Sequence, residues 1–266
     1  MSVECIHGLD DRMCDLCFPK PVPETTSVHS AAAVGARLRT ATAIRARPSV
    51  GSAPRRTVAT AATRPGVPFK VGEQRIYHLT QVANLADILS HGELRCDPPG
   101  AIWAEVVRQA RRKTEIVSGG VVADYVPFFL TPNARVWEAV RSSAPDPRLS
   151  PDLRGQLPAD FVLIVSTIAK VASLATVVAD RDATLPLTRF ATDQESSDRM
   201  LRRLHGDDDA ITDAEFLVKG AFPLELVSLI GVAHAKARDT VKSILSSSGY
   251  STKVSVYPPW FQRPEE

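Results

Sequence analysis

No apolar run in the 266-residue sequence approaches the roughly 18 consecutive residues that a membrane-spanning helix requires. The chain begins MSVECIHG, which lacks both the basic start and the apolar core of a secretory signal. The sequence therefore predicts a soluble, cytoplasmic protein that has no membrane partner.

The common nucleotide-binding and hydrolytic motifs are also missing. The chain contains neither GxxxxGK[ST] nor GxGxxG, the glycine-rich loops that hold phosphates in ATPases and Rossmann enzymes. The nucleophile elbow GxSxG and the zinc motif HExxH are absent as well. These absences argue against an ATPase, a Rossmann-fold enzyme and the common hydrolases.

Cysteine is scarce, and three of the four cysteines lie within the first seventeen positions. This clustering differs from a disulfide framework spread over a secreted domain. Three thiolates and one imidazole can complete a tetrahedral zinc shell, and so short a segment needs the metal in order to fold. We predict a structural zinc site in residues 1–20, with incidental free cysteines as the alternative. The ligands would be Cys5, His7, Cys14 and Cys17.

Residues 21–66 contain no aromatic residue. They include seven arginines and one glutamate, which gives a net charge of +6. A stretch with so few large apolar side chains cannot bury enough surface to offset its ordering entropy. We therefore predict a basic, disordered linker over residues 21–68. It either contacts the phosphate backbone of a nucleic acid, without base specificity, or is a solvated spacer.

From Phe69 onward the composition is that of a folded domain, which we expect to span residues 69–266. Strand-like and helix-like patterns mix without regular alternation, which favours an α+β fold over a doubly wound sheet. Cys96 is isolated here and is expected to be a small packed residue. Strands are expected at 74–78, 121–130, 160–167, 214–220, 226–233 and 253–257. Helices are expected at 80–91, 101–113, 168–175, 196–205 and 237–247.

Two polar side chains of this domain are candidate site residues. The stretch AEFLVKG places Glu215 at the start of an apolar strand, and RIYHLT places His78 at the end of another. Residue type alone leaves two interpretations of each. Glu215 is either a solvent-facing strand residue or a catalytic acid, and His78 is either structural or a ligand contact.

Four blocks of the sequence resemble the DarT family of DNA ADP-ribosyltransferase toxins. IYHLTQVANLADILSHGEL (76–94) is similar to the family's opening YHxT…NLxxILxxG pattern, and GGVVADYVPFF (119–129) to its GGxxxDYVPFYF block. AEFLVKGAFPLELV (214–227) is similar to the AEFLV block that carries the catalytic glutamate, and VSVYPPWF (254–261) fits the closing strand. The blocks occur in order across residues 74–261.

The resemblance implies an ADP-ribosyltransferase-like split β-sheet core with peripheral helices, and a cleft that binds NAD. Carried onto matching positions, it makes Glu215 the catalytic glutamate and His78 a contact to the nicotinamide side of NAD. Thr80 and Asn84 would support the same end of the cofactor.

The resemblance also assigns an arginine to the site. Arg112 best matches a family arginine that follows the first long helix, with a role in catalysis and NAD binding, although Arg111 is one residue away and the alignment there is loose. Family members carry an Asp-x-(Asn or His)-Ala type of motif in mid-chain. Here the sequence is ADRDAT, and Asp182 departs from that pattern.

The function implied is that of a toxin that transfers ADP-ribose from NAD to guanine or thymine in single-stranded DNA, with guanine favoured. Its partner would be a cognate antitoxin with ADP-ribosyl-hydrolase activity. Two alternatives stay open: modification of RNA or protein, and a nucleic-acid-binding domain of the same fold without catalysis.

Overall fold

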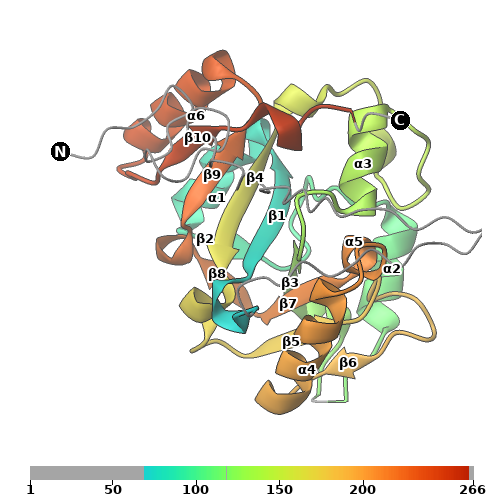
Figure 1. The fold of residues 1–266 in the computed structure, drawn as a ribbon. Coiled ribbons are helices and arrows are strands. Elements are labelled where there is room, and N and C mark those ends of the chain that lie inside the picture. Colours follow the sequence, from blue (N-terminus) through green and yellow to red (C-terminus); the bar gives the residue numbers. More distant parts are fainter. Residues whose placement is uncertain (1–68, 118, 264–266) are drawn as a thin grey trace, which may run out of the picture. The chain divides into compact units, whose positions relative to one another are not determined.

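The computed structural model describes residues 69–117 and 119–263 (Figure 1). The predicted zinc segment and linker, residues 1–68, lie outside the described residues, so the zinc site and both domain boundaries stay predictions. Within the described ranges, no helix combines the length and the apolar character needed to cross a membrane.

The described strands form one large mixed sheet and one small ribbon. They are β1 (Arg75–Gln81), β2 (Glu93–Arg95), β3 (Tyr125–Phe129), β4 (Phe161–Thr167), β5 (Thr176–Ala179), β6 (Phe190–Ala191), β7 (Glu215–Lys219), β8 (Ala221–Pro223), β9 (Leu229–Val232) and β10 (Val254–Val256). The large sheet has the order β10–β9–β4–β1–β3–β7–β5–β6, and the ribbon pairs β2 with β8. The β9–β10 pair is parallel and the other pairs are antiparallel.

Helices and turns connect these strands. The described α-helices are α1 (Leu85–His91), α2 (Glu105–Lys113), α3 (Arg135–Ser142), α4 (Gln194–His205), α5 (Ala210–Asp213) and α6 (Ala235–Ser247). Helix α1 ends at Gly92, whose φ of 74° is the left-handed conformation that glycine adopts without strain. Helix α4 begins at Asp193, whose carboxylate accepts the backbone N–H of Ser196.

Each half of the large sheet is well paired, but the two halves meet at a narrow junction. Seven residue pairs join β1 to β4 and five join β3 to β7, whereas β1 and β3 share only the pair Tyr77–Phe129. The strands therefore diverge on one side of this pair, and the sheet is split between β1 and β3. A split sheet leaves strand backbone and side chains accessible in its middle, where a ligand can enter.

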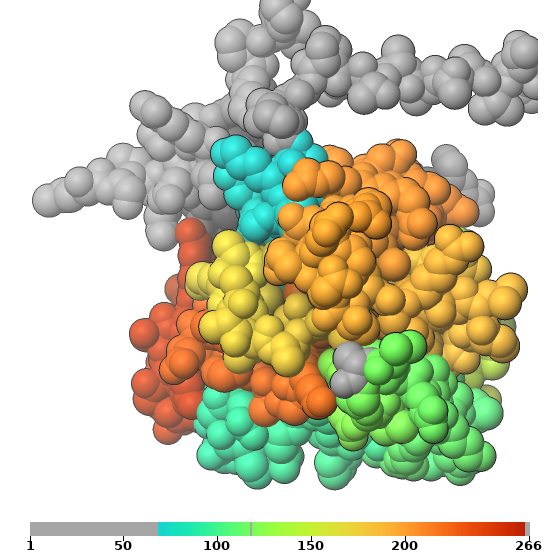
Figure 2. Space-filling view, turned by 90° about the horizontal axis from the view of Figure 1, so that it is seen from below, coloured from blue at the N-terminus to red at the C-terminus, as the bar shows by residue number. Residues whose placement is uncertain are grey.

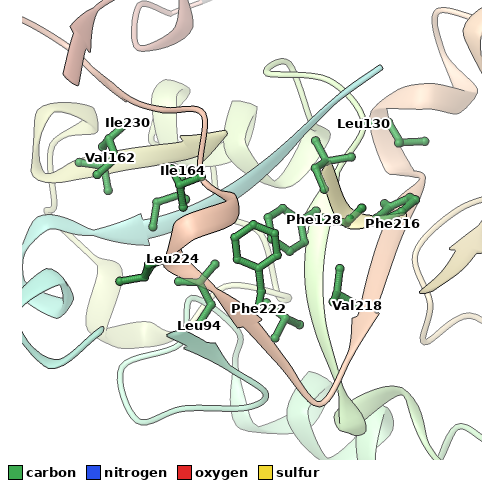
Figure 3. Packing of buried hydrophobic residues seen from close by; sticks show 14 of the residues in the cluster. Leu94, Phe128, Leu130, Val162, Ile164, Phe216, Val218, Phe222, Leu224 and Ile230 are labelled. Carbon is green, nitrogen blue, oxygen red and sulfur yellow. The ribbon is translucent and has the colours of Figure 1, made fainter. Parts of the chain in front are cut away.

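Two separate hydrophobic clusters hold the sheet between helices. One face packs against α1, α4 and α6, and its centre contains the rings of Phe128, Phe216 and Phe222 (Figure 3). The other face packs against α2 and α3, with Trp137 fully buried among Phe161 and Phe261. Strand β4 is buried along most of its length, as its run of β-branched and aromatic residues requires.

The start of the described chain packs against α4. In Figure 2 the cyan segment that begins at residue 69 lies beside the orange segment that contains α4. The Phe69 ring stacks on His205 at the end of α4, with the ring centroids 3.9 Å apart. This contact attaches the first described residue to the folded domain.

The expected mixture of helices and strands is confirmed, but the prediction of one helix is wrong. Only Ile168–Val171 forms a 3-10 turn where a helix over residues 168–175 was expected, because the chain reverses there to enter β5. Helix α2 begins at Glu105 rather than residue 101, since Ile102 and Trp103 pack into the core ahead of it.

Candidate active site

A groove opens along the split between β1 and β3. Its empty space is about 850 Å³ with the open mouth included. The groove wall combines several parts of the chain: the end of β1, helix α1, strand β2, the loop of residues 97–103 between β2 and α2, Arg111 of α2, and residues of and just before β3. Among the residues singled out from the sequence, His78, Thr80, Asn84 and Arg111 line it.

His78 bridges the two halves of the sheet where their backbone pairing stops. Its Nδ1 lies 2.9 Å from the carbonyl oxygen of Pro127 on β3. A carbonyl can only accept, so Nδ1 carries the proton and Nε2 is left as an acceptor in the neutral ring. Burial lowers the pKa of His78, which keeps the ring neutral near pH 7.

Thr80 and Asn84 form a short chain of hydrogen bonds at one end of the groove. The side-chain amide of Asn84 donates to Oγ1 of Thr80 and to the carbonyl oxygen of Gly100, each over 3.1 Å. Asn84 therefore ties the loop of residues 96–103 to the end of β1.

Glu215 is the first residue of β7, and its carboxylate is held from two sides. Oε2 accepts a hydrogen bond from Nη1 of Arg111 over 2.9 Å, and Oε1 accepts one from the backbone N–H of Ala183 over 3.0 Å. Glu215 is 1% exposed and Arg111 is 5% exposed. A buried ion pair of this kind fixes the carboxylate in one orientation.

The guanidinium of Arg111 keeps a free donor. Its Cζ lies 5.5 Å from the centre of the Trp103 ring, which stabilises the cation. Nη2 is buried and has no hydrogen-bond partner among the described residues, although Arg111 lines the groove. A buried donor without a partner favours an oxygen-bearing ligand at this position.

The arginine matched from the sequence, Arg112, lies elsewhere. Its guanidinium is 44% exposed and bonds to Asp97 and Glu105 at the surface. Neighbouring residues on an α-helix differ by about 100° in direction, so Arg111 and Arg112 face opposite surroundings. The structure thus places Arg111, not Arg112, against Glu215, and the loose alignment of the sequence blocks could not distinguish them.

A second, smaller cavity adjoins the groove; its empty space is about 190 Å³ with open solvent included. Trp103 and Phe129 line both spaces, Arg111 lines only the groove, and Glu215 lines only the cavity. The Arg111–Glu215 pair therefore separates them.

Of the cavity's polar residues, the sequence analysis singled out Glu215 and Asp182 and missed Arg148, Thr212 and Asp213. The guanidinium of Arg148 donates two hydrogen bonds to the carboxylate of Asp146. Its Nη1 lies 3.4 Å from Oδ1 of Asp213 and 3.8 Å from Oδ2 of Asp182. Asp182 is 7% exposed, and its Oδ1 accepts the backbone N–H and the hydroxyl of Thr184. Asp213 is two residues before Glu215, but Arg148 comes from a distant segment, and no local pattern could have joined Arg148 to Glu215.

Comparisons with known proteins decide the family. The model of the family described as "ssDNA thymidine ADP-ribosyltransferase, DarT" matches residues 77–262. The chain belongs to the DarT family. Curated relatives within it are the DNA ADP-ribosyl transferases of Thermus sp. and Thermus aquaticus. They are 30% and 32% identical to this chain, over 86% and 80% of their own lengths and 64% of this chain.

Solved DarT structures share the fold. The Thermus sp. 2.9 DarT complexes with NAD+ and with ADP-ribosylated single-stranded DNA are both 26% identical, with a TM-score of 0.59. They cover 71% of this chain and 98% and 96% of theirs. Thermosipho africanus DarTG with ADP-ribose, at 12% identity and a TM-score of 0.55, shares the fold; the match covers 71% of this chain and 51% of that one.

Proposed function

We propose that this DarT-family protein transfers ADP-ribose from NAD to a base of single-stranded DNA and releases nicotinamide. The observation that carries the proposal is the buried Arg111–Glu215 pair between a groove and a cavity. The relatives named DNA ADP-ribosyl transferases, and the solved complexes with NAD+ and ADP-ribosylated DNA, support the substrates.

The groove residues fit NAD as the donor. The Nε2 of neutral His78 accepts a hydrogen bond from a ribose hydroxyl or from the nicotinamide amide. The free Nη2 of Arg111 meets an oxygen of the cofactor, which satisfies a donor that is otherwise unpaired within the described residues. Thr80 and Asn84 contribute through their hydrogen-bonded chain to the shape of the groove.

Glu215 supplies the electrostatic part of the reaction. The bond between the ribose C1′ and the nicotinamide nitrogen breaks, its electron pair leaves with neutral nicotinamide, and positive charge develops on the ribose. A fixed carboxylate beside that carbon stabilises this charge more in the transition state than in the ground state. The base nitrogen then bonds to C1′ and gives up its proton to Glu215 or water.

The small cavity is the proposed site of the acceptor base. Three carboxylates, from Asp182, Asp213 and Glu215, line it against one guanidinium, from Arg148. Carboxylates accept hydrogen bonds, so this lining favours a base edge with adjacent donors. Guanine offers N1–H and its amino group side by side, whereas thymine offers one donor between two carbonyls. We therefore infer guanine as the acceptor, although the matching family model is named for thymidine.

The biological role follows from the family resemblance. Modified bases block DNA copying, so the activity suits a cytoplasmic toxin that is held in check by an antitoxin with ADP-ribosyl-hydrolase activity. Expression should arrest growth, and co-expression of such a hydrolase should restore it. Growth arrest that persists when Glu215 is replaced by Gln would separate toxicity from the transfer reaction.

A competition assay tests the acceptor. Single-stranded DNA, RNA and a protein mixture are incubated together with the enzyme and labelled NAD. Label is expected in DNA alone, and nucleoside analysis should find it on guanosine. Label on thymidine would overturn the choice of base but not of reaction. Label in RNA or protein would overturn the acceptor class, and oligonucleotide binding without nicotinamide release would indicate a non-catalytic domain.

A further inference from the structure

The loop of residues 96–103, here called the rim loop, forms one wall of the groove. It connects β2 to α2, and all of residues 97–103 line the groove. Its shape is unusual for its sequence, because Asp97 has a φ of 41° in the left-handed region that residues other than glycine rarely adopt. A backbone held in such a conformation needs contacts that fix it.

Two arginines of α2 provide those contacts. Oδ2 of Asp97 accepts hydrogen bonds from Nε and Nη2 of Arg112, over 3.0 and 2.6 Å. Oδ1 accepts one from Nε of Arg108, and the Asp97 carbonyl oxygen accepts another from Nη2 of Arg108 over 3.2 Å. Arg108 and Arg112 are four residues apart and share one helix face.

The environment makes this network stronger than an ordinary surface ion pair. The side chain of Asp97 is 22% exposed, and one carboxylate is shared by two guanidinium groups. Charge-assisted hydrogen bonds with two parallel donors impose direction as well as energy. The rim loop is fixed at a second point by the bond from Asn84 to Gly100. It is therefore held near its start, at Asp97, and in its middle, at Gly100.

We propose that Asp97, Arg108 and Arg112 form a clasp that presets the rim loop in the shape that binds NAD. This inference rests on the proposed function. Arg112 is a positioning residue that acts through Asp97, which accounts for its place beside the groove without contact with Glu215. Without the clasp the loop samples other shapes, and apparent NAD affinity falls in proportion to the population of the binding shape.

The test is the effect of Arg112→Ala on NAD binding and turnover. The dissociation constant from calorimetry and the KM for NAD are expected to rise together by about three- to tenfold, with kcat nearly unchanged. Arg112→Lys keeps the positive charge but lacks the paired N–H donors of the guanidinium. Its dissociation constant and KM for NAD should therefore lie between those of the unaltered protein and those of Arg112→Ala. Lys113→Ala is the matched control, because this neighbouring exposed cation does not line the groove.

A double-mutant cycle assigns the effect to the clasp. Asp97→Asn should weaken NAD binding as Arg112→Ala does, and the double variant should be no worse than either single variant. Additive losses would overturn the clasp, as would unchanged NAD affinity in Arg112→Ala. A large loss of kcat at constant KM would also overturn it, since Arg112 would then contact the reacting atoms. Because calorimetry reports NAD binding without any acceptor, failure of DNA modification in the unaltered protein would count against the proposed function alone.

Discussion

Glu215 combines a buried position with two fixed donors, from Arg111 and Ala183. A carboxylate at a solvent-facing strand position would have neither. Of the two interpretations of the AEFLV stretch, the solvent-facing one is wrong, because Glu215 is 1% exposed. The alternation along β7 puts Glu215 and Leu217 on one face and the aromatic core on the other, and the catalytic role stays a prediction. The choice between the adjacent arginines depended on helix rotation, which could not be read from a loosely aligned segment.

Replacement of Glu215 by Gln should remove activity while leaving the fold intact. Gln keeps the shape and can still accept the hydrogen bond from Ala183, but it lacks the negative charge that stabilises the ribosyl cation. We expect kcat to fall about 10²- to 10³-fold. Nicotinamide release measures the rate, and circular dichroism shows whether the variant is folded; a folded variant with unchanged kcat would remove Glu215 from the mechanism.

Replacement of Arg111 separates its role from that of Arg112. Arg111→Ala leaves Glu215 buried without its cation, which costs about 3–5 kcal/mol of stability when a buried pair loses one partner. Arg112→Ala removes a side chain that is 44% exposed and leaves no buried charge without a partner, so its cost in stability should be much smaller. Urea unfolding of the two variants measures the difference, and equal losses would contradict the burial of Arg111.

The pH dependence of NAD binding should report on His78. Its pKa is lowered in the folded protein from an ordinary value of about 6.5. The neutral ring therefore stabilises the fold fully above about pH 6.5, and this contribution is lost as pH falls through the lower folded-state pKa. NAD affinity should decline over the same acidic range. The His78→Gln protein should lack the part of this decline that comes from protonation of His78. If the two proteins show the same dependence of NAD affinity on pH, His78 does not accept a hydrogen bond from NAD.

At the scale of elements, the central strands were predictable and the connections were not. Strands β1, β3, β4 and β7 have apolar runs that a sequence reveals. Helix α3 was missed although Val136, Trp137 and Val140 have helical spacing. Strand β5, directly after the helix expected over residues 168–175, was not predicted, because TVVA is too short to show its own period. The split between β1 and β3 depends on long-range pairing, and only the family resemblance suggested it.

The far half of the sheet should act as scaffold. A Cβ on Gly231 of β9 would lie 2.7 Å from Cζ3 of Trp260, so Gly231→Ala overpacks the core. We expect the free energy of unfolding to fall by about 1–3 kcal/mol. At temperatures below the unfolding transition, kcat/KM should be unchanged. Gly206→Ala is the control, since its Cβ would meet only ordinary contacts. A loss of activity without a loss of stability would mean that β9 takes part in the site.

At the scale of the whole molecule, the sequence divides a catalytic domain from a basic, cysteine-bearing N-terminal region. Residues 69–263 contain the groove, the cavity and both large clusters. For residues 1–68 the composition is the only guide, and the zinc and linker predictions rest on it alone.

Metal analysis tests the zinc segment. The full chain should bind one zinc ion, and Cys14→Ser should release it. Cys96→Ser should retain it, because this cysteine lies in the folded domain beside the carbonyl of Gly220. Zinc loss from both variants, or no zinc in the intact chain, would contradict the assignment.

Removal of residues 1–68 tests substrate recruitment. The shortened protein should keep kcat at saturating oligonucleotide, but its DNA affinity should fall and depend less on salt, because eight arginines are lost. Unchanged affinity and salt dependence would show that the basic region is only a spacer.

The central claim is that Glu215, paired with Arg111, drives transfer of ADP-ribose to a DNA base. Mass spectrometry of nucleosides from an oligonucleotide pool incubated with NAD tests it most directly, with nicotinamide measured in the same sample. The account predicts one ADP-ribosylated guanosine per nicotinamide released by the unaltered protein, and neither product from Glu215→Gln. Nicotinamide release without any base adduct, or equal adduct from the Glu215→Gln protein, would contradict it.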